Sequence, residues 1–253
     1  MNVVGTRTLL SKEVRRFLKV PGQTVLSPLI STTLYFVVFG YTLGARQTDL
    51  EGVPYIRFIV PGLVFLGIAN NAFLNSSSSL FITKIQGTLV DLLVAPLGPM
   101  ELLIAFIVGA MVRGLLVGLL TWGVALFFTG MPSLHWGATI FFLLTASYVF
   151  SMLGLLAGLW AEKFEQINFF PTFFMLPLTF LGGVFYSVDK LPEPFRTLSL
   201  FNPVVHMVEG LRYGMLGLAH GQVAFGAALL LVLTVITTAV AYALLKSGYK
   251  LKV

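Results

Sequence analysis

Few side chains of this sequence have the types and spacing needed for catalysis. The three histidines, His135, His206 and His220, stand too far apart for a metal-binding pattern, and the chain has no cysteine. His206 and Glu209 have the spacing of one helical face, on which an imidazole and a carboxylate could exchange a proton. A single His–Glu pair of this kind is usually a local hydrogen bond. We therefore keep an enzyme that uses this pair only as an alternative interpretation.

The motifs of nucleotide hydrolysis and of common hydrolases are absent from the sequence. It contains no Gly-x-x-x-x-Gly-Lys-Ser/Thr, no His-Glu-x-x-His and no Gly-x-Ser-x-Gly. We therefore expect no catalytic residue, no metal and no cofactor in this chain, and we predict that it is not itself an enzyme.

The composition predicts an integral membrane protein. Hydrophobic residues make up 57% of the 253 residues and charged residues 10%, whereas an ordinary soluble domain has about 25% charged residues. A soluble fold of this length could not bury so much apolar surface. The net charge is +6, and we assign the excess to membrane orientation rather than to nucleic acid.

The uncharged stretches predict an all-α membrane protein with six transmembrane helices. Continuously apolar runs favour helices over the alternating pattern of a membrane barrel. The whole chain, 1–253, is predicted to form one membrane domain. Lys and Arg are more frequent in the segments assigned to the inner side, so both termini are predicted to be cytoplasmic. The expected spans are 23–44, 58–80, 101–128, 137–160, 166–187 and 223–245.

Polar residues inside these spans are candidates for a pathway or for a subunit interface. Arg113 stands in the middle of the third span, where an arginine costs about 2.5–3.5 kcal/mol, so it should face protein or water. The second span carries a polar group in which most members share one helical stripe. Hydrogen bonding between packed helices is the alternative role. This group comprises Asn70, Asn71, Asn75, Ser78 and Ser79. Phe173, in the phenylalanine-rich fifth span, could line the same path or pack against lipid.

Three segments outside the spans have their own patterns. Residues 6–20 form a basic helix with apolar residues at Leu10, Val14, Phe17 and Leu18, typical of a helix lying flat at the membrane surface. The inner connection 84–96 has an apolar face of Leu89, Leu92 and Leu93, which requires a partner or the membrane. The outer segment 188–222 is too apolar for open solvent and too short to span, which is typical of a re-entrant hairpin.

Several motifs resemble those of the type-two ABC exporter permeases, in their bacterial small-permease branch. The connection reads Gly87-Thr88-Leu89-x-Asp91-Leu92-Leu93-x-x-Pro96, like the coupling helix of that family. Phe58 to Leu63 begins the second span in a similar way. The end of the fifth span and the outer hairpin also match, at Gly182 to Ser187 (which includes Tyr186), Leu191-Pro192, Asn202-Pro203 and Gly210 to Gly214.

This resemblance implies the membrane subunit of an ATP-driven exporter in the bacterial inner membrane. The permease would pair with a second permease copy and bind two copies of a separate ABC ATPase, which would hold the ATP and Mg. The segment 84–96 would rest on that ATPase, and 6–20 would be the elbow helix. The substrate would be a hydrophobic or amphipathic compound such as a drug, a lipid or a lipid-linked glycan. A secondary transporter driven by an ion gradient and a lipid-modifying membrane enzyme remain the alternatives.

Overall fold

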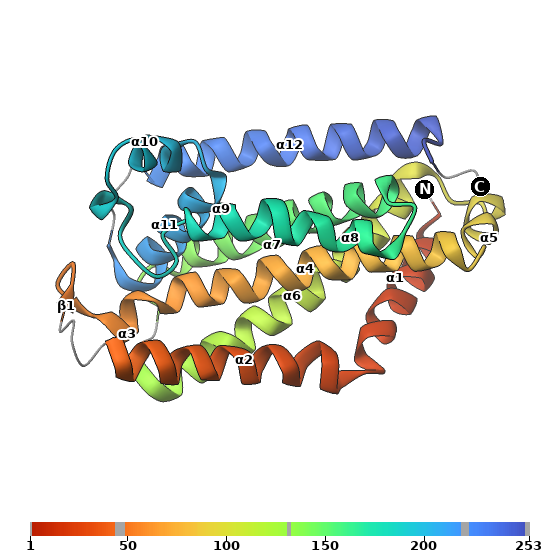
Figure 1. Cartoon of the computed structure of the whole chain (residues 1–253). Coiled ribbons are helices and arrows are strands. Elements are labelled where there is room, and N and C mark those ends of the chain that lie inside the picture. The colour runs from red at the N-terminus through yellow and green to blue at the C-terminus, as the bar shows by residue number, and fades with distance from the viewer. Residues whose placement is uncertain (1, 44–48, 131–132, 219–222, 251–253) are drawn as a thin grey trace.

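The computed structural model describes residues 2–43, 49–130, 133–218 and 223–250. These residues are mostly helical, as predicted (Figure 1). A short antiparallel pair of strands, β1 (Asp49–Leu50) and β2 (Val53–Pro54), turns through Glu51 and Gly52, which both have positive φ. Within the described ranges, five helical stretches are long and apolar enough to cross a membrane. These stretches are Gly22–Phe39, Tyr55–Ile85, Pro99–Thr129, Trp136–Trp160 and Val223–Ser247.

Helix α4 (Val60–Ile85) is the central and most buried of the long helices. It packs against α6 (Pro99–Thr129), α7 (Trp136–Trp160) and α11 (Pro203–Leu216). Helix α12 (Val223–Ser247) runs along the opposite side of the bundle from α2 (Ser27–Tyr35), which is part of the first helical stretch, Gly22–Phe39 (Figure 1). Helix α4 continues past the end of the second predicted span, 58–80, to Ile85.

The first crossing helix is continuous through η1 (Gly22–Leu26), α2 (Ser27–Tyr35) and η2 (Phe36–Leu43). It lies where 23–44 was predicted, and residue 44 is outside the described residues. The turn at η1 is widened, because the Ser27 N–H bonds the Gly22 carbonyl five residues back. Such π-helical turns are frequent at functional sites.

The predicted fifth span is shorter than expected. Helix covers α8 (Phe164–Phe170), η3 (Pro171–Met175) and α9 (Leu176–Phe180), and the predicted continuation to 187 is wrong because the helix ends at Phe180. Gly183 has φ +69°, a left-handed conformation that no α-helix contains and that glycine adopts most easily. This stretch is not among the five membrane-crossing candidates, so the count of six spans remains a prediction.

The two ends of the bundle differ in the short elements they carry. Helix α5 (Leu89–Val94) and the start of α1 (Val3–Leu18) lie at one end (Figure 1). The other end holds the β1–β2 pair and the short helices α3 (Tyr55–Phe58), η4 (Val188–Lys190) and α10 (Phe195–Leu200), together with α11. The predicted hairpin 188–222 thus contains three separate helices, and its residues 219–222 lie outside the described residues.

Candidate functional site

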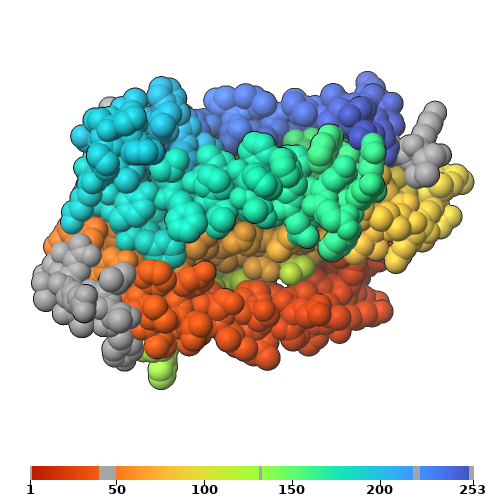
Figure 2. Space-filling model, viewed as in Figure 1, coloured from red at the N-terminus to blue at the C-terminus, as the bar shows by residue number. Residues whose placement is uncertain are grey.

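A cavity of about 440 Å³ lies beside α4. Its walls come from the first crossing helix, α4, α6 and α9, and it holds both polar and apolar side chains. Figure 2 shows α4 and α6 exposed between the first crossing helix on one side and α8–α9 on the other. We call this hollow of about 440 Å³ the arginine cavity. It is lined by Gln23, Ser27, Pro28, Ser31, Thr32, Tyr35, Leu63, Leu66, Gly67, Asn70, Asn71, Leu74, Arg113, Leu176, Thr179, Phe180 and Phe185.

Arg113 and Asn71, both predicted as pathway candidates, meet in the wall of this cavity. Arg113 Nη2 donates a 3.2 Å hydrogen bond to Asn71 Oδ1, and Asn71 Nδ2 donates to the Gly67 carbonyl at 3.0 Å. The buried Nε of Arg113 has no hydrogen-bond partner. Asn70 is exposed in the same wall. The arginine therefore faces protein and the cavity, as expected of a charge at this depth.

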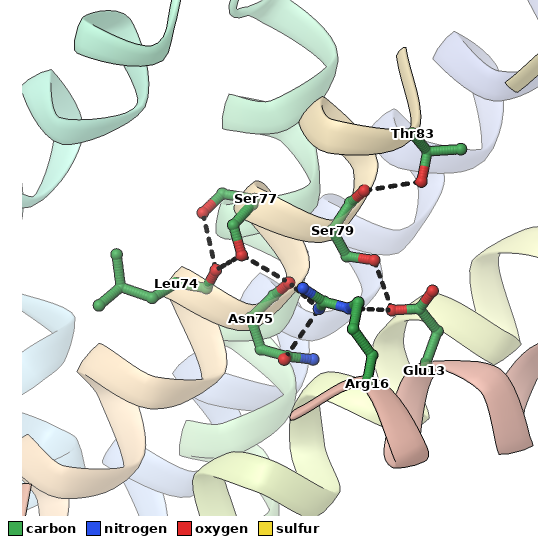
Figure 3. A network of polar contacts seen from close by, with 8 residues as sticks. Glu13, Arg16, Leu74, Asn75, Ser77, Ser79 and Thr83 are labelled. Atoms are coloured by element: carbon green, nitrogen blue, oxygen red, sulfur yellow. Dashed lines mark hydrogen bonds and ion pairs between the residues drawn. The ribbon is translucent and has the colours of Figure 1, made fainter. Parts of the chain in front are cut away.

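Two further residues of the predicted stripe, Asn75 and Ser79, lie in a buried network with α1 (Figure 3). Arg16 Nη2 donates to Asn75 Oδ1 at 3.0 Å and to the Asn75 carbonyl at 3.1 Å. The Ser79 hydroxyl donates to the Glu13 carboxylate, which also pairs with Arg16 at 3.3 Å. We call Glu13, Arg16, Asn75 and Ser79 the α1 clamp, because they join α1 to α4.

The packed face of α1 differs from the predicted apolar face. The buried residues are Thr6, Leu9, Glu13 and Phe17, whereas Leu18 is exposed. Hydrophobic spacing alone missed this face because its centre is a carboxylate. The available signal was Glu13 itself, which is the one acidic residue in the basic segment 6–20.

The remaining pathway candidates lie elsewhere. The Ser78 hydroxyl bonds the Leu74 carbonyl of its own helix. Phe173 is 63% exposed and stacks on Phe169 at 4.7 Å between ring centroids. The Tyr186 hydroxyl bonds the Phe180 carbonyl, and its neighbour Phe185, rather than Tyr186, lines the arginine cavity. The structure therefore brings together only part of the predicted set.

Sequence reasoning also missed the polar wall that the first crossing helix supplies. Gln23, Ser27, Ser31 and Tyr35 line the arginine cavity and recur every fourth residue. This spacing places them on one face of a helix. Small and polar residues at that interval were a readable signal in a stretch that was interpreted only as an uncharged span.

The segment 84–96 forms a short helix with an anchored side and an exposed side. Gly87, with φ +71°, ends α4 and turns the chain, and Thr88 is the N-cap of α5. Leu89, Leu92 and Leu93 lie at i, i+3 and i+4 of this helix, and their burial falls along that face: Leu89 is buried, Leu92 is half-buried and Leu93 is 42% exposed. The exposed apolar residues are Ile85, Val90, Leu93 and Val94. Asp91 is exposed, and Pro96 follows the extended Ala95 that ends α5.

The start of α1 contacts the chain just after α5. The Asn2 backbone N–H donates to Glu101 Oε1 at 3.0 Å, and Asn2 Nδ2 donates to the Pro96 carbonyl at 3.3 Å. Further along the same helix lies the α1 clamp, which holds Asn75 and Ser79 of α4. Helix α1 thus joins the end of α5 to the polar stripe that begins at the arginine cavity.

At the opposite end, the residues considered for acid–base chemistry have separate partners. His206 Nε2 lies 3.0 Å from the Leu200 carbonyl, and Glu209 accepts a 2.9 Å bond from Arg212. Arg212 is fully buried, donates to the Gly183 carbonyl at 2.8 Å and lies 3.9 Å above the Phe58 ring. This arrangement joins α11 to α3 and to the turn after α9, which is a structural role.

A second hollow lies on the other side of α4. It has a volume of about 480 Å³ and an entirely apolar lining, and we call it the apolar groove. Its residues are Phe73, Val149, Phe150, Leu153, Leu156, Ala157, Trp160, Phe170, Phe174, Met175, Leu178, Pro203, Val204, Met207, Leu233, Val240 and Leu244.

The helical bundle and its long apolar helices define the class: a multi-pass membrane protein. Comparison with known proteins identifies the family. The profile of the ABC-2 type transporter matches residues 5–216, and the chain belongs to this family. The resemblance inferred from the sequence motifs is therefore confirmed.

Two relatives illustrate the range of the family. The chain is 40% identical to the inner membrane transport permease YadH of Escherichia coli (strain K12) over 215 residues, which cover 85% of this chain and 84% of that protein. It is 24% identical to nodulation protein J of Rhizobium leguminosarum bv. viciae over 228 residues, which cover 88% of this chain and 86% of that protein.

Proposed function

We propose that this chain is the permease subunit of an ATP-driven exporter of the bacterial inner membrane. Two copies pair, and a separate ABC ATPase on the cytoplasmic side binds ATP and Mg and drives their movement. The chain itself contributes the route for the substrate and no catalytic group. The family assignment and the transport permease YadH, a relative from the inner membrane, support this proposal.

The observation that carries the proposal is the exposed apolar side of α5. Val90, Leu93 and Val94 are 58%, 42% and 80% exposed on one short helix at an end of the bundle. Apolar side chains gathered at such a place mark an interaction surface. We take this surface as the site where the ATPase docks, and the α5 end as the cytoplasmic end.

The opposite side of α5 supports a role in transmission. Leu89 is buried in a cluster with Leu80 of α4 and Leu102 of α6. Because an anchored helix cannot move alone, a push on its exposed side displaces the helices beneath it. The contacts of Asn2 with Pro96 and Glu101 extend this linkage to α1.

The arginine cavity supports an amphipathic substrate. Amide and hydroxyl groups stand beside leucine and phenylalanine side chains in one hollow of drug-like size. The cavity lies between the first crossing helix and α9. Both helices carry exposed apolar residues, such as Leu34 on the first crossing helix and Phe180 on α9. In our proposal a second permease copy faces this side and closes the route.

The docking role is tested by substitutions on the exposed side of α5. Val90→Asp and Leu93→Asp, singly and together, are expected to abolish ATPase binding and permease-stimulated ATP hydrolysis while leaving the permease folded. Leu92 is half-buried, so Leu92→Asp would confound docking with folding. Leu198→Asp is the matched control, because Leu198 is 56% exposed on α10 at the other end.

The measurement is co-purification of permease and ATPase in detergent, followed by hydrolysis in liposomes. A neighbouring reading frame that encodes a P-loop protein is the natural source of the ATPase. Retained binding and hydrolysis in the Val90→Asp, Leu93→Asp double variant would refute the docking role. Gradient-driven flux by the chain alone would refute the ATP-driven mechanism.

A further inference from the structure

We propose that the arginine cavity is a binding site for an amphiphile that carries an anionic group, such as a phosphate or carboxylate on an alkyl chain. Arg113 holds the anionic group, and the apolar wall holds the chain. This inference rests on the proposed transport function, which it sharpens by naming the substrate class and the residue that selects it.

The first argument is charge. Among the described residues that line the cavity, Arg113 is the one charged side chain, and none is Asp or Glu. Among the described residues, its side-chain partner is a neutral amide, that of Asn71, which it contacts through one nitrogen atom. Its Nε is buried without a partner. A guanidinium has five donors in a planar fork that suits a carboxylate or phosphate, so most of its capacity is unused here.

The contrast with Arg16 and Arg212 strengthens this argument. Arg16 pairs with Glu13, and Arg212 pairs with Glu209. Both of these half-buried or buried arginines therefore have a carboxylate within the chain. Arg113 has no such carboxylate among the described residues. An anionic ligand would supply the missing partner.

The second argument is the shape of the lining. Along α4 the cavity runs from Leu63 to Leu74, which corresponds to about 16 Å of helix at 1.5 Å per residue. The first crossing helix runs antiparallel to it, from Gln23 to Tyr35. The cavity is therefore elongated along the bundle, as an extended chain requires.

The third argument is the distribution of polarity along that length. Arg113, Asn71 and Gln23 line the half nearer α5. The half nearer α3 has no charged side chain and is lined mainly by aromatic and leucine residues, with the hydroxyls of Thr32 and Thr179; the Tyr35 and Phe185 rings lie 6.0 Å apart there between centroids. A headgroup at Arg113 thus leaves its alkyl chain among aromatic and leucine side chains, pointing toward the α3 end.

Binding can be measured on the purified chain in phosphatidylcholine nanodiscs, without any ATPase. The probes share a twelve-carbon chain and differ in charge: dodecyl phosphate, dodecyl maltoside and dodecyl trimethylammonium. Equilibrium binding is corrected with empty nanodiscs. We expect saturable binding of dodecyl phosphate that the neutral and cationic probes do not match, because only the phosphate forms charge-assisted hydrogen bonds with Arg113.

Arg113→Gln is expected to weaken dodecyl phosphate binding about tenfold or more, and Arg113→Lys to restore part of it. Arg15→Gln is the matched control, since Arg15 is exposed on α1 and its loss changes the net charge equally. Should Arg113→Gln fail to fold, Ser31→Trp serves instead. It fills the cavity from an exposed position, leaves Arg113 in place and should also abolish binding.

Equal binding by wild type, Arg113→Gln and Ser31→Trp would overturn the proposal, as would equal affinity for the cationic probe. Inorganic phosphate that binds as tightly as dodecyl phosphate would overturn the role of the alkyl chain. Replacing part of the phosphatidylcholine with phosphatidylglycerol identifies the source of the ligand. Competition supports a bilayer lipid, and its absence supports a solute that enters from outside the bilayer. Because no ATPase is present, these results stand apart from the α5 docking test.

Discussion

The two hollows beside α4 have similar volumes, about 440 and 480 Å³, but the arginine cavity has a mixed polar and apolar lining whereas the apolar groove has an apolar one. The apolar groove needs no explanation in a membrane, since lipid chains match its lining. The arginine cavity does need an explanation, because a charged side chain at the depth of Arg113 costs about 2.5–3.5 kcal/mol when it faces lipid. Arg113 opposes membrane insertion and yet lines a cavity. Its presence there is a stronger indication of substrate binding than the cavity volume, which the two hollows share.

The helices on the two sides of α4 are also held by different forces. On the arginine side, the α1 clamp joins α1 to α4 by ionic and hydrogen bonds. On the other side, Gly154 and Gly158 let α7 approach the α4 backbone. A Cβ added at Gly154 would meet the Phe73 carbonyl at 2.3 Å, and one at Gly158 would meet the Ser77 carbonyl at 2.7 Å. Charge holds the first interface, and close backbone packing holds the second.

The largest effect is expected from breaking the α1 clamp on one side only. Arg16→Ala leaves the Glu13 carboxylate, which is 1% exposed, without its cation. Removing one partner of a buried ion pair costs about 3–5 kcal/mol. We expect a marked fall in the thermal unfolding midpoint of the detergent-solubilised chain, accompanied by protease sensitivity within α1.

The double variant Glu13→Gln, Arg16→Ala separates ion pairing from packing. It should recover much of the lost stability, since no buried charge is left unpaired. Arg15→Ala, at an exposed position on the same helix, is the control and should have little effect. If Arg16→Ala and Arg15→Ala have equal unfolding midpoints, the clamp does not hold α1.

A smaller loss is expected on the other side of α4 from Gly154→Ala. The added methyl must displace the α4 backbone or the Ser76 side chain, which lies 2.2 Å from the new Cβ position. Overpacking of this kind costs about 1–3 kcal/mol. Gly123→Ala on α6 is the matched control, because nothing lies within 4 Å of its added Cβ. Unfolding midpoints that are equal for the two variants would show that α7 can move away from α4 without loss.

These two interfaces show what the sequence could predict. Apolar runs located the long helices, because helix length and hydropathy are local properties. The end of the predicted fifth span was wrong, because the turn at Gly182 and Gly183 lies inside a stretch that is still apolar. The glycines of α7 follow the Gly-x-x-x-Gly pattern, at Gly154 and Gly158, and that pattern was available in the sequence.

The polar stripe of α4 was visible in the sequence, but its partners were not. Asn71 and Arg113 were both singled out, and the structure joins them. Asn75 and Ser79 were singled out too, but the basic residues of 6–20, including Arg16, were expected to face anionic lipid, and Glu13 was not considered. Which face of a short amphipathic helix is buried depends on the surface it meets, and this information lies in distant parts of the chain.

A modest effect is expected from removing one hydrogen bond between helices on each side of α4. Asn71→Leu removes the bond between α4 and α6, and Tyr148→Phe removes the 2.7 Å bond to Thr238 that joins α7 and α12. Each should cost about 0.6 kcal/mol of stability. We expect Asn71→Leu alone to change the affinity for dodecyl phosphate, since Asn71 orients Arg113. Equal dodecyl phosphate affinities in the two variants would contradict that assignment.

The smallest effect is expected from an ion pair at the aqueous rim of the bundle. Lys250 Nζ lies 2.5 Å from Glu162 Oε1 and 3.1 Å from the Trp160 carbonyl, so it joins the region after α12 to the end of α7. The hydrogen bond from Lys250 holds the pKa of Glu162 below its usual value of 4.5, and the same bond raises the pKa of Lys250 above 10.5. Glu162 is exposed and Lys250 is partly exposed, so salt should weaken the pair.

The sign of each shift sets the pH range of this stabilisation. The Glu162 contribution is present above its unfolded pKa and is lost as the pH falls through the lowered folded pKa. The Lys250 contribution is present below its unfolded pKa and is lost as the pH rises through the raised one. Glu162→Gln should therefore lower the unfolding midpoint slightly between about pH 5 and pH 10 and not at either extreme. High salt should remove this difference, whereas it should leave the buried clamp of Glu13 and Arg16 intact. Equal salt effects on the two pairs would contradict this distinction between the buried Glu13–Arg16 pair and the Glu162–Lys250 pair at the rim.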